Sequence, residues 1–329
     1  MAKSLIGIDI GHKTLKLTCS ESGVIKKAKV FEFPDYIVEE GNITSYDDMG
    51  FFIRKSMIDA GMSADEAALV LNSDQVFIKL TEMPVMTVDQ LKLNLPFEFS
   101  DYISDNSEDD YIYDYIVIDN SIQTEEGEYM RLLAAAAPKE HMENMRNMLK
   151  KAGLKLVMAA PTEYSYIGAL RNCGFDKDQI ERCIVDIGYN TIHLYIFKGD
   201  DYLLTRYIDK GMQNVEEAIA ELFGVDEETA HEYFNGNHEN CIEDEACIEV
   251  YDDLIREIQR AINFYRFNNP DSDISDIWIC GIGAFNKPLY ELLNEKVDLD
   301  VHIGSELLEK SYSGEEGFMF VKASGIIWG

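Results

Sequence analysis

The chain has 329 residues, of which 46% are hydrophobic, and it carries a net charge of −32 at pH 7. This excess of negative charge argues against binding to nucleic acid and against direct adhesion to anionic lipid. The length predicts two folding units, no signal peptide opens the chain, and no apolar run approaches the ~20 residues of a membrane span. The six cysteines form no Cys-x-x-Cys pair and the six histidines lack ligand spacing, so we expect buried thiols in a reducing compartment.

The first 80 residues alternate between apolar runs and turn residues, and this pattern predicts strands with one helix between them. The helix is expected over Tyr46–Ala60, with Gly61 as its stop. The expected strands are Leu5–Ile10, Leu15–Ser20, Val24–Phe33, Ala67–Asn72 and Val76–Thr81.

The stretch 81–160 predicts a small β/α module. Thr87 opens a helix with a Thr-x-x-Gln capping box, and Pro96 should kink or end that helix. The most acidic stretch of the chain, Asp101–Glu128, contains a strongly β-prone run. The other elements expected here are strands at Tyr111–Ile118, Tyr129–Ala137 and Leu154–Ala159 and a helix at Lys139–Ala152 with methionines on its core face.

Beyond residue 161 the pattern alternates again between strands and helices. The expected strands are Thr191–Phe197, Asp201–Ile208, Ile277–Cys280 and Val301–Ile303. The expected helices are Thr162–Asn172, Val215–Phe223, Glu227–Phe234, Glu243–Asn268, Lys287–Asn294 and Phe318–Trp328.

One short signature occurs twice, about a domain's length apart. Ile6–Gly11 reads Ile-Gly-Ile-Asp-Ile-Gly, and Cys183–Gly188 reads Cys-Ile-Val-Asp-Ile-Gly. Each copy ends an apolar run and precedes a short polar turn and a second apolar run. The repeat predicts two similar lobes, each of which presents a strand–turn–strand hairpin toward a shared cleft.

The residue types of the signature suit phosphate binding. Glycine lets the backbone turn tightly and lets its N–H groups approach an anion, and an aspartate at the strand end can position a metal or its waters. A single copy is more often only a strand followed by a turn, but two copies at domain spacing favour the phosphate-binding interpretation.

The chain resembles the actin-like ATPase superfamily in these two loops and in a third segment, Asp276–Ala284, which is similar to the glycine turn that lies against adenosine in that fold. Three other segments, Leu80–Leu91, Lys150–Leu154 and Gly211–Val225, resemble the PilM family of type IV pilus assembly proteins. Their order and spacing match over nearly all of the chain. The resemblance implies an α/β, actin-like (ribonuclease H-like) two-lobed fold with an inserted β/α module of the 1C type.

The resemblance also implies a division of the chain. The first lobe is expected at 1–80 and 161–181, the inserted module at 81–160, the second-lobe core at 182–214 and 271–329, the last including the C-terminal helix, and a helical subdomain at 215–270.

Nucleotide-binding positions follow residue by residue from the resemblance. The first loop would contribute Asp9, Gly11, His12, Lys13, Thr14 and Lys16; the second loop Asp186, Gly188, Tyr189, Asn190 and Thr191; the adenosine side Gly211, Gly281, Ile282, Gly283 and Ala284. Asp9 and Asp186 would hold Mg²⁺ indirectly through its waters, and Glu163 is the candidate catalytic residue. ATP and Mg²⁺ are therefore the implied cofactors.

Several residues depart from the pattern of the family. Tyr189 and Asn190 stand where small residues are usual, His193 where Asp is frequent, and Ile282 where a second Gly is usual. In the helical subdomain His231 and Phe234 replace a polar pair that would face the base and ribose. Each lost polar contact weakens nucleotide binding by about 1 kcal/mol. We therefore expect a weak ATPase at most, without efficient turnover.

The function implied by the resemblance is that of a scaffold at the inner face of the cell membrane. It would bind the N-terminal tail of a PilN-like membrane protein in a groove between the first lobe and the inserted module, alongside other pilus assembly proteins. Binding of an extended peptide requires an apolar trough and backbone partners. The protein would be cytoplasmic and would reach the membrane through its partners.

Two alternatives stay open at the level of sequence. An FtsA-like cell-division protein shares the architecture, but it would carry a C-terminal amphipathic helix, and this chain stops at Ile326–Gly329. An actin-fold small-molecule kinase would need a catalytic aspartate, and none stands in a recognisable context between Thr81 and Ala160.

Overall fold

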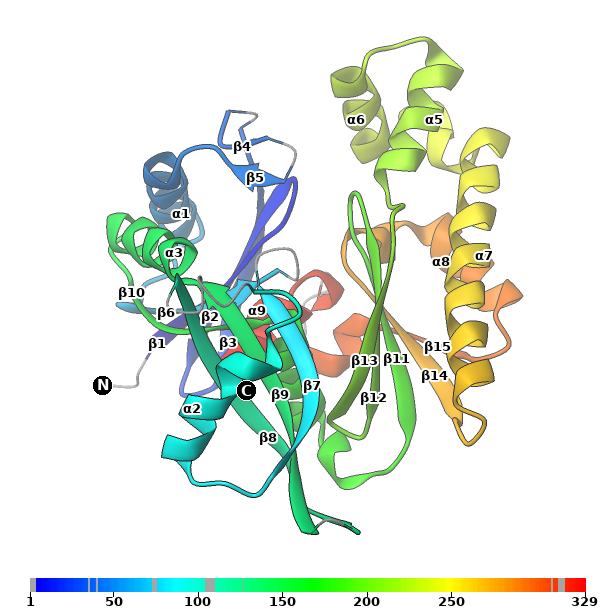
Figure 1. Cartoon of the computed structure of the whole chain (residues 1–329). Coiled ribbons are helices and arrows are strands. Elements are labelled where there is room, and N and C mark those ends of the chain that lie inside the picture. The colour runs from blue at the N-terminus through cyan, green and yellow to red at the C-terminus, as the bar shows by residue number, and fades with distance from the viewer. Residues whose placement is uncertain are drawn as a thin grey trace. The chain divides into compact units, whose positions relative to one another are not determined.

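The computed structural model describes residues 4–34, 36–39, 41–72, 76–103, 110–125, 127–308, 310–312 and 317–329. The chain divides into two compact units (Figure 1). Unit 1 comprises Met1–Arg171 and Lys322–Gly329, and unit 2 comprises Asn172–Val321.

The centre of unit 1 is a five-stranded sheet with the strand order β10-β6-β1-β2-β3. β1, β2 and β3 form an antiparallel meander, β6 runs parallel to β1, and β10 runs parallel to β6. The strands are β1 (Ser4–Ile10), β2 (Thr14–Glu21), β3 (Val24–Glu32), β6 (Glu66–Leu71) and β10 (Lys155–Pro161). A two-stranded ribbon, β4 (Val38–Glu39) and β5 (Asn42–Ile43), was not expected from the sequence.

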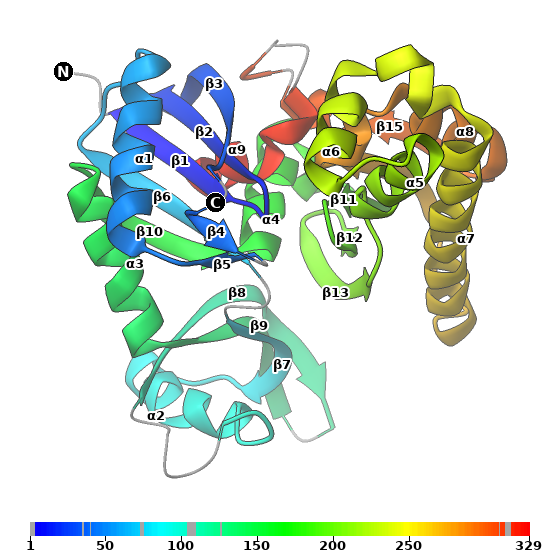
Figure 2. The ribbon, with the colours of Figure 1, turned by 90° about the horizontal axis from the view of Figure 1, so that it is seen from above.

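Helices cover both faces of this sheet. α1 (Tyr46–Asp59) and α3 (Lys139–Lys151) pack on one face through a core that includes Ile6, Ile53 and Met148, and Figure 2 shows both helices along the same side. The other face packs on α4 (Thr162–Cys173) and α9 (Val321–Trp328), where Ala68 and Val70 contact Ile326.

The inserted module is a three-stranded sheet with the strand order β7-β9-β8 and one helix. Leu91, Leu95 and Phe99 pack against this sheet. The elements are β7 (Phe77–Pro84), α2 (Val88–Glu98), β8 (Tyr111–Thr124) and β9 (Gly127–Pro138). The capping box at Thr87 is confirmed.

The module is shorter than expected, because α3 and β10, which the sequence placed within 81–160, belong to the five-stranded sheet and its helical layer. Pro96 lies inside α2, which ends two residues later at Glu98. β8 extends six residues beyond its expected end at Ile118. Within the acidic stretch Asp101–Glu128, residues 104–109 and 126 lie outside the described part of the chain.

Unit 2 repeats this architecture with the strand order β13-β12-β11-β14-β15. β11, β12 and β13 again form an antiparallel meander, β14 runs parallel to β11, and β15 runs parallel to β14. The strands are β11 (Glu181–Ile187), β12 (Ile192–Lys198), β13 (Asp201–Ile208), β14 (Ile274–Cys280) and β15 (Asp300–Ile303). The identical strand order in both units confirms the internal repeat and the α/β class.

The helices of unit 2 bury one face of its sheet. Tyr251, Leu254 and Ile258 of α7 pack against strand residues such as Val185 and Leu194. The helices are α5 (Gln213–Phe223), α6 (Glu227–Gly236), α7 (Glu245–Asn268) and α8 (Lys287–Lys296). Short 3₁₀ turns are η2 (Phe175–Lys177), η3 (His238–Glu243), η4 (Ile282–Phe285), η5 (Gly304–Leu308) and η6 (Gly317–Met319).

The C-terminal helix corrects one expected boundary. The sequence placed all of 271–329 in the second lobe, but Lys322–Gly329 belongs to unit 1. The physical reason is close backbone approach: a Cβ added to Gly7 would lie 1.7 Å from the carbonyl oxygen of Ala323, and one added to Gly325 would lie 1.9 Å from that of Ser165. Gly7 therefore allows α9 to pack directly on β1, and Gly325 allows α9 to pack directly on α4.

All six cysteines are free thiols, and only Cys173 is not buried. Burial raises the pKa of Cys183 and Cys247 to about 12, so these thiols stay protonated. Among the described residues, no helix combines the length and hydrophobicity that a membrane span requires.

Candidate functional site

The first predicted loop is a tight hairpin between β1 and β2. The N–H of Gly11 donates to the carbonyl of Thr14 over 2.9 Å. The N–H of Phe33 donates to the carbonyl of Lys13 over 3.0 Å, and the Asn72 amide donates to the carbonyl of Ile10 over 2.8 Å. These bonds hold the glycine turn from β3 on one side and from the end of β6 on the other.

A charged cluster lies at the base of this hairpin. Asp9, the last but one residue of β1, is fully buried, and Lys16 is its cross-strand partner. The Nζ atoms of Lys16 and Lys322 each lie 3.5 Å from the same carboxylate oxygen, Oδ2 of Asp9. Their side chains are 7% and 16% exposed, so the two ammonium groups and the carboxylate are all largely removed from water.

Lys322 was not among the residues predicted from the sequence. It lies in the first turn of α9, and a buried bond from the Thr18 hydroxyl to the carbonyl of Ala323 over 2.7 Å fixes that turn against β2. Lys322 is the single charged residue of α9, whose sequence is Val-Lys-Ala-Ser-Gly-Ile-Ile-Trp. That exception to the pattern is the signal that could have identified it.

The second predicted loop has the same backbone hydrogen bond as the first. The N–H of Gly188 donates to the carbonyl of Thr191 over 2.9 Å, and Asp186 stands opposite His193 as Asp9 stands opposite Lys16. The N–H of Gln213 donates to the carbonyl of Tyr189 over 2.8 Å, which ties the loop to the start of α5. Gly211 is required there, since a Cβ would lie 2.3 Å from the Tyr189 carbonyl oxygen.

Tyr189 begins a hydrogen-bond network that the sequence did not predict. Its hydroxyl donates to Oε2 of Glu216 over 2.7 Å, and Oε1 of Glu216 lies 2.8 Å from Nδ1 of His231. Nε2 of His231 is in turn 3.0 Å from the Asn235 amide. Burial, followed by the hydrogen bond to Glu216, raises the pKa of Tyr189, so its hydroxyl remains a neutral donor.

The third predicted segment lies against the second loop. Gly281 has a φ of +81°, and a Cβ there would meet Oδ1 of Asp186 at 2.4 Å. A Cβ on Gly283 would meet the Ile187 side chain at 2.2 Å. Unit 2 therefore brings together its predicted residues Asp186, Gly188, Tyr189, Asn190, Thr191, Gly211, Gly281, Ile282, Gly283 and Ala284 at one end of its sheet.

Unit 1 likewise groups Asp9, Gly11, His12, Lys13, Thr14 and Lys16 on the β1–β2 hairpin. Glu163, the candidate catalytic residue, lies buried in the first turn of α4. Its catalytic role stays a prediction.

The donor set around Asp9 does not fit a magnesium ion. A divalent cation prefers several oxygen ligands, whereas Asp9 Oδ2 already faces two ammonium groups whose charge repels a further cation. Among the described residues, no three histidine, cysteine or acidic side chains are grouped as a metal site.

Unit 1 also contains a pocket of about 390 Å³ between the inserted module and the main sheet. Residues of β8, β9, α3 and β10 line it, and β8 and β10 are the outermost strands of their sheets within the described chain. Apolar side chains such as Ile112, Leu133 and Met158 line it, and Asp114, Arg146 and Tyr164 add polar groups. Burial raises the pKa of Tyr164, and the nearby Asp114 carboxylate raises it further.

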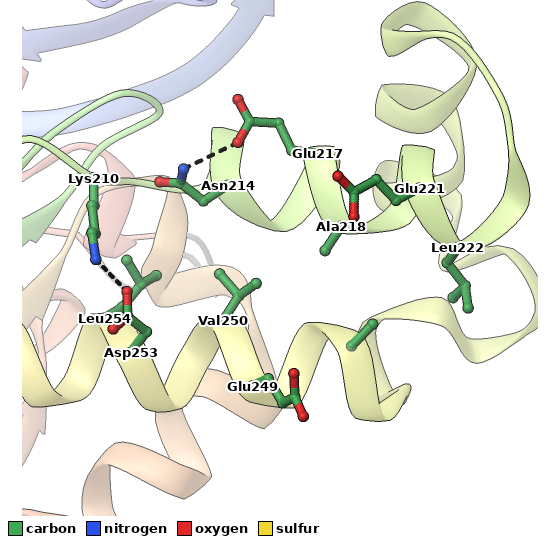
Figure 3. Close-up of a pocket in the computed structure, with 11 residues that line it drawn as sticks. Lys210, Asn214, Glu217, Ala218, Glu221, Leu222, Glu249, Val250, Asp253 and Leu254 are labelled. Carbon is green, nitrogen blue, oxygen red and sulfur yellow. Dashed lines mark hydrogen bonds and ion pairs between the residues drawn. The ribbon is translucent and has the colours of Figure 1, made fainter.

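Unit 2 has a second pocket, of about 670 Å³, between α5 and α7 (Figure 3). Ala218, Val250 and Leu254 contribute apolar surface, and Lys210 forms an ion pair with Asp253 at one end. Its lining shares no residue with the predicted nucleotide positions; Lys210 immediately precedes Gly211.

Comparison with known proteins gives one family match. The family model of type IV pilus assembly protein PilM matches residues 7–315. A chain of a PilM–PilN type IV pilus biogenesis complex has a TM-score of 0.82 at 21% identity, covering 98% of this chain and 97% of that one.

Two further solved structures share the fold at greater distance. The ethanolamine utilization protein EutJ from Carboxydothermus hydrogenoformans has a TM-score of 0.62 at 14% identity, covering 99% of this chain and 90% of that one. The archaeal actin homolog Ta0583 has a TM-score of 0.53 at 12% identity, covering 99% and 98%. These likenesses confirm the actin-like fold.

Proposed function

The chain belongs to the family of type IV pilus assembly protein PilM, and on that premise we propose that it is a scaffold that binds the N-terminal tail of a PilN-like membrane protein. The observation that carries this proposal is the pocket between β8 and β10 in unit 1. Through this partner the protein would be held at the cytoplasmic face of the membrane with other pilus assembly proteins.

The pocket has the chemistry that an extended peptide needs. β8 and β10 are edge strands among the described residues, so their outward backbone groups can pair with a peptide that adds as a strand. Ile112, Ile116 and Met158 offer apolar contacts for alternate side chains of such a peptide. Backbone pairing would supply affinity, and the side-chain contacts would supply specificity.

The acidic residues near the pocket favour a peptide tail that carries Lys or Arg beside its apolar anchors. Asp114 lies in the pocket itself, and Asp110 immediately precedes β8. Charges at a rim change association rate and salt dependence more than final affinity. Charge reversal at Asp110, with Asp109 in the adjoining stretch outside the described residues, should slow association at low salt and matter little at high salt.

A matched pair of variants on β8 tests the location. Ile112 and Val117 are each 43% exposed, but only Ile112 lines the pocket. With a labelled peptide of the PilN-like tail, Ile112→Asp should weaken binding about tenfold or more, whereas Val117→Asp should stay within about twofold. Equal affinities of the two variants would place the peptide elsewhere on the protein.

The nucleotide is a second part of the proposed function. We infer that the first loop, in unit 1, binds the phosphates of ATP. Support comes from the repeated hairpin, whose Gly11 and Gly188 have the same N–H bond to a threonine carbonyl. Hydrolysis would be slow, because a Tyr–Glu–His network occupies the second loop and two lysines flank Asp9.

Titration calorimetry with ATP tests this part. Asp9→Ala and Lys16→Ala should each weaken binding about tenfold, because Lys16 supplies an ammonium group at the loop and Asp9 holds the ammonium groups of Lys16 and Lys322 in place. Unchanged affinity in both variants would exclude this loop as the phosphate site, and it would leave the peptide pocket untouched as a proposal.

A further inference from the structure

The cluster around Asp9 contains a cation that the nucleotide pattern does not require. Asp9 and Lys16 come from the repeated hairpin, but Lys322 comes from α9, 313 residues further along the chain than Asp9. Both ammonium groups lie 3.5 Å from Oδ2 of a carboxylate that is fully buried. The carboxylate therefore faces two ammonium groups from two distant parts of the chain.

The position of Lys322 is built into the backbone of unit 1. The Thr18 hydroxyl donates to the carbonyl of the next residue, Ala323, and β1 has Gly7 where a Cβ would lie 1.7 Å from that carbonyl oxygen. At the far end of α9 the Trp328 indole donates to the carbonyl of Gly23 over 2.7 Å. The ammonium group is therefore presented to Asp9 by a helix held at both ends.

The place beside a strand-end aspartate is where a divalent cation would neutralise bound phosphates. Here two ammonium groups occupy that side of Asp9, and like charges at such distances repel strongly in a largely buried site. An ammonium group can neutralise the charge of a phosphate as a metal ion does, because it offers a full positive charge and three N–H donors.

We propose that Lys322 replaces the divalent cation at the phosphate loop of unit 1, so that this loop binds the phosphates of an adenine nucleotide without magnesium. The inference rests on the proposed nucleotide binding and is independent of the peptide pocket. It also gives a reason for slow hydrolysis, since no metal would position or activate a water at Asp9.

The test is calorimetric titration of the full chain with ATP, once with excess EDTA and once with magnesium. The wild-type affinities should agree within about twofold. Lys322→Met should lose about tenfold in EDTA and recover part of the loss with magnesium, because removal of one ammonium group opens the position to a metal. Lys322→Arg, which keeps the charge, should stay within about threefold of the wild type in EDTA.

The matched control is Lys26→Met, which removes an exposed lysine from β3 of the same unit and should leave both affinities unchanged. A wild-type protein that loses about tenfold or more in EDTA overturns this inference alone, whether or not the variants fold. Equal EDTA affinities of Lys322→Met and Lys26→Met overturn it as well. Failure to bind ATP in both buffers overturns this inference together with the nucleotide proposal.

Discussion

In the β1–β2 hairpin Asp9 stands opposite Lys16, whereas in the β11–β12 hairpin Asp186 stands opposite His193. The two hairpins share their register and the N–H bond from glycine to threonine. Around the first, two ammonium groups gather on one carboxylate; around the second, Tyr189, Glu216 and His231 form a hydrogen-bonded chain. The backbone geometry is the same in both copies, while the charged groups beside the glycine turn differ.

The strands behind the two loops differ as well. Two residues before the aspartate, β1 has Gly7 and β11 has the fully buried Ile184. Gly7 allows the main chain of α9 to approach, whereas Ile184 fills its space with a side chain. The residue type at equivalent positions of the repeat therefore depends on the element that packs against each position.

The largest expected effect follows from this difference. Gly7→Ala should reduce the free energy of unfolding by about 3 kcal/mol or more, because its Cβ overlaps the Ala323 carbonyl and α9 must move. Chemical denaturation would measure the loss. Gly236→Ala, a helical glycine whose Cβ would meet no atom within 4 Å, is the control and should be neutral or stabilising. A Gly7→Ala protein of wild-type stability would mean that α9 does not pack on β1.

The next largest loss of stability is expected when the cross-strand partner of each aspartate is replaced by methionine. Lys16→Met should cost about 2 kcal/mol, because it leaves the buried Asp9 carboxylate with Lys322 as its one remaining ammonium partner in the cluster. His193→Met should cost about 1 kcal/mol, since it removes the stacking of the ring on Tyr195, whose centroid lies 5.9 Å away. Denaturation midpoints of the two variants measure the contrast. Equal losses would show that the lysine cluster contributes no special stability.

The network of the second hairpin predicts a smaller loss. Glu216→Ala should cost about 1.5 kcal/mol, because Tyr189 and His231 lose their shared acceptor. Glu217→Ala on the exposed side of α5 should change stability by less than about 0.5 kcal/mol.

The pH dependence of the same network checks its cause. The folded pKa of Tyr189 lies above its ordinary value of 10.0, so the unfolded chain loses this proton first, and stability should fall as pH rises above 10. In Glu216→Ala the pKa of Tyr189 should move back toward its ordinary value, as ultraviolet titration would detect. An identical titration in both proteins would contradict the hydrogen bond.

The smallest effect concerns the start of β11. Two hydrogen bonds from Arg182, of 2.8 and 2.9 Å, hold the pKa of Asp178 below its ordinary value of 3.8. This stability is present above that value and is lost as pH falls through the lower folded pKa. Asp178→Asn should cost about 1 kcal/mol at pH 7 and flatten the acid limb of the stability profile. An unchanged acid limb would rule out this pair as a source of acid sensitivity.

Local pattern was sufficient for the elements that carry strong periodicity or clear caps. The capping box at Thr87, the α7 face with Tyr251 and Ile258, and both Asp-Ile-Gly strand ends were predicted and are confirmed. Apolar period and side-chain caps act within one or two turns, so the sequence alone states them. The repeat, the actin-like fold and the PilM family likewise followed from residues that stand together in the chain.

The tertiary structure alone decided which distant residues meet. Lys322 reaches Asp9 because Gly7 and Thr18 accept α9, and Glu216 reaches Tyr189 because α5 starts on the second loop. It also placed β10 beside β6 in the main sheet and α3 in the helical layer on that sheet. Which strands pair depends on contacts between distant parts of the chain, and local pattern does not state them. Sequence spacing determines the geometry of a turn or a helix face, but contacts across 313 residues depend on how whole elements pack, and the charge around Asp9 is set at that level.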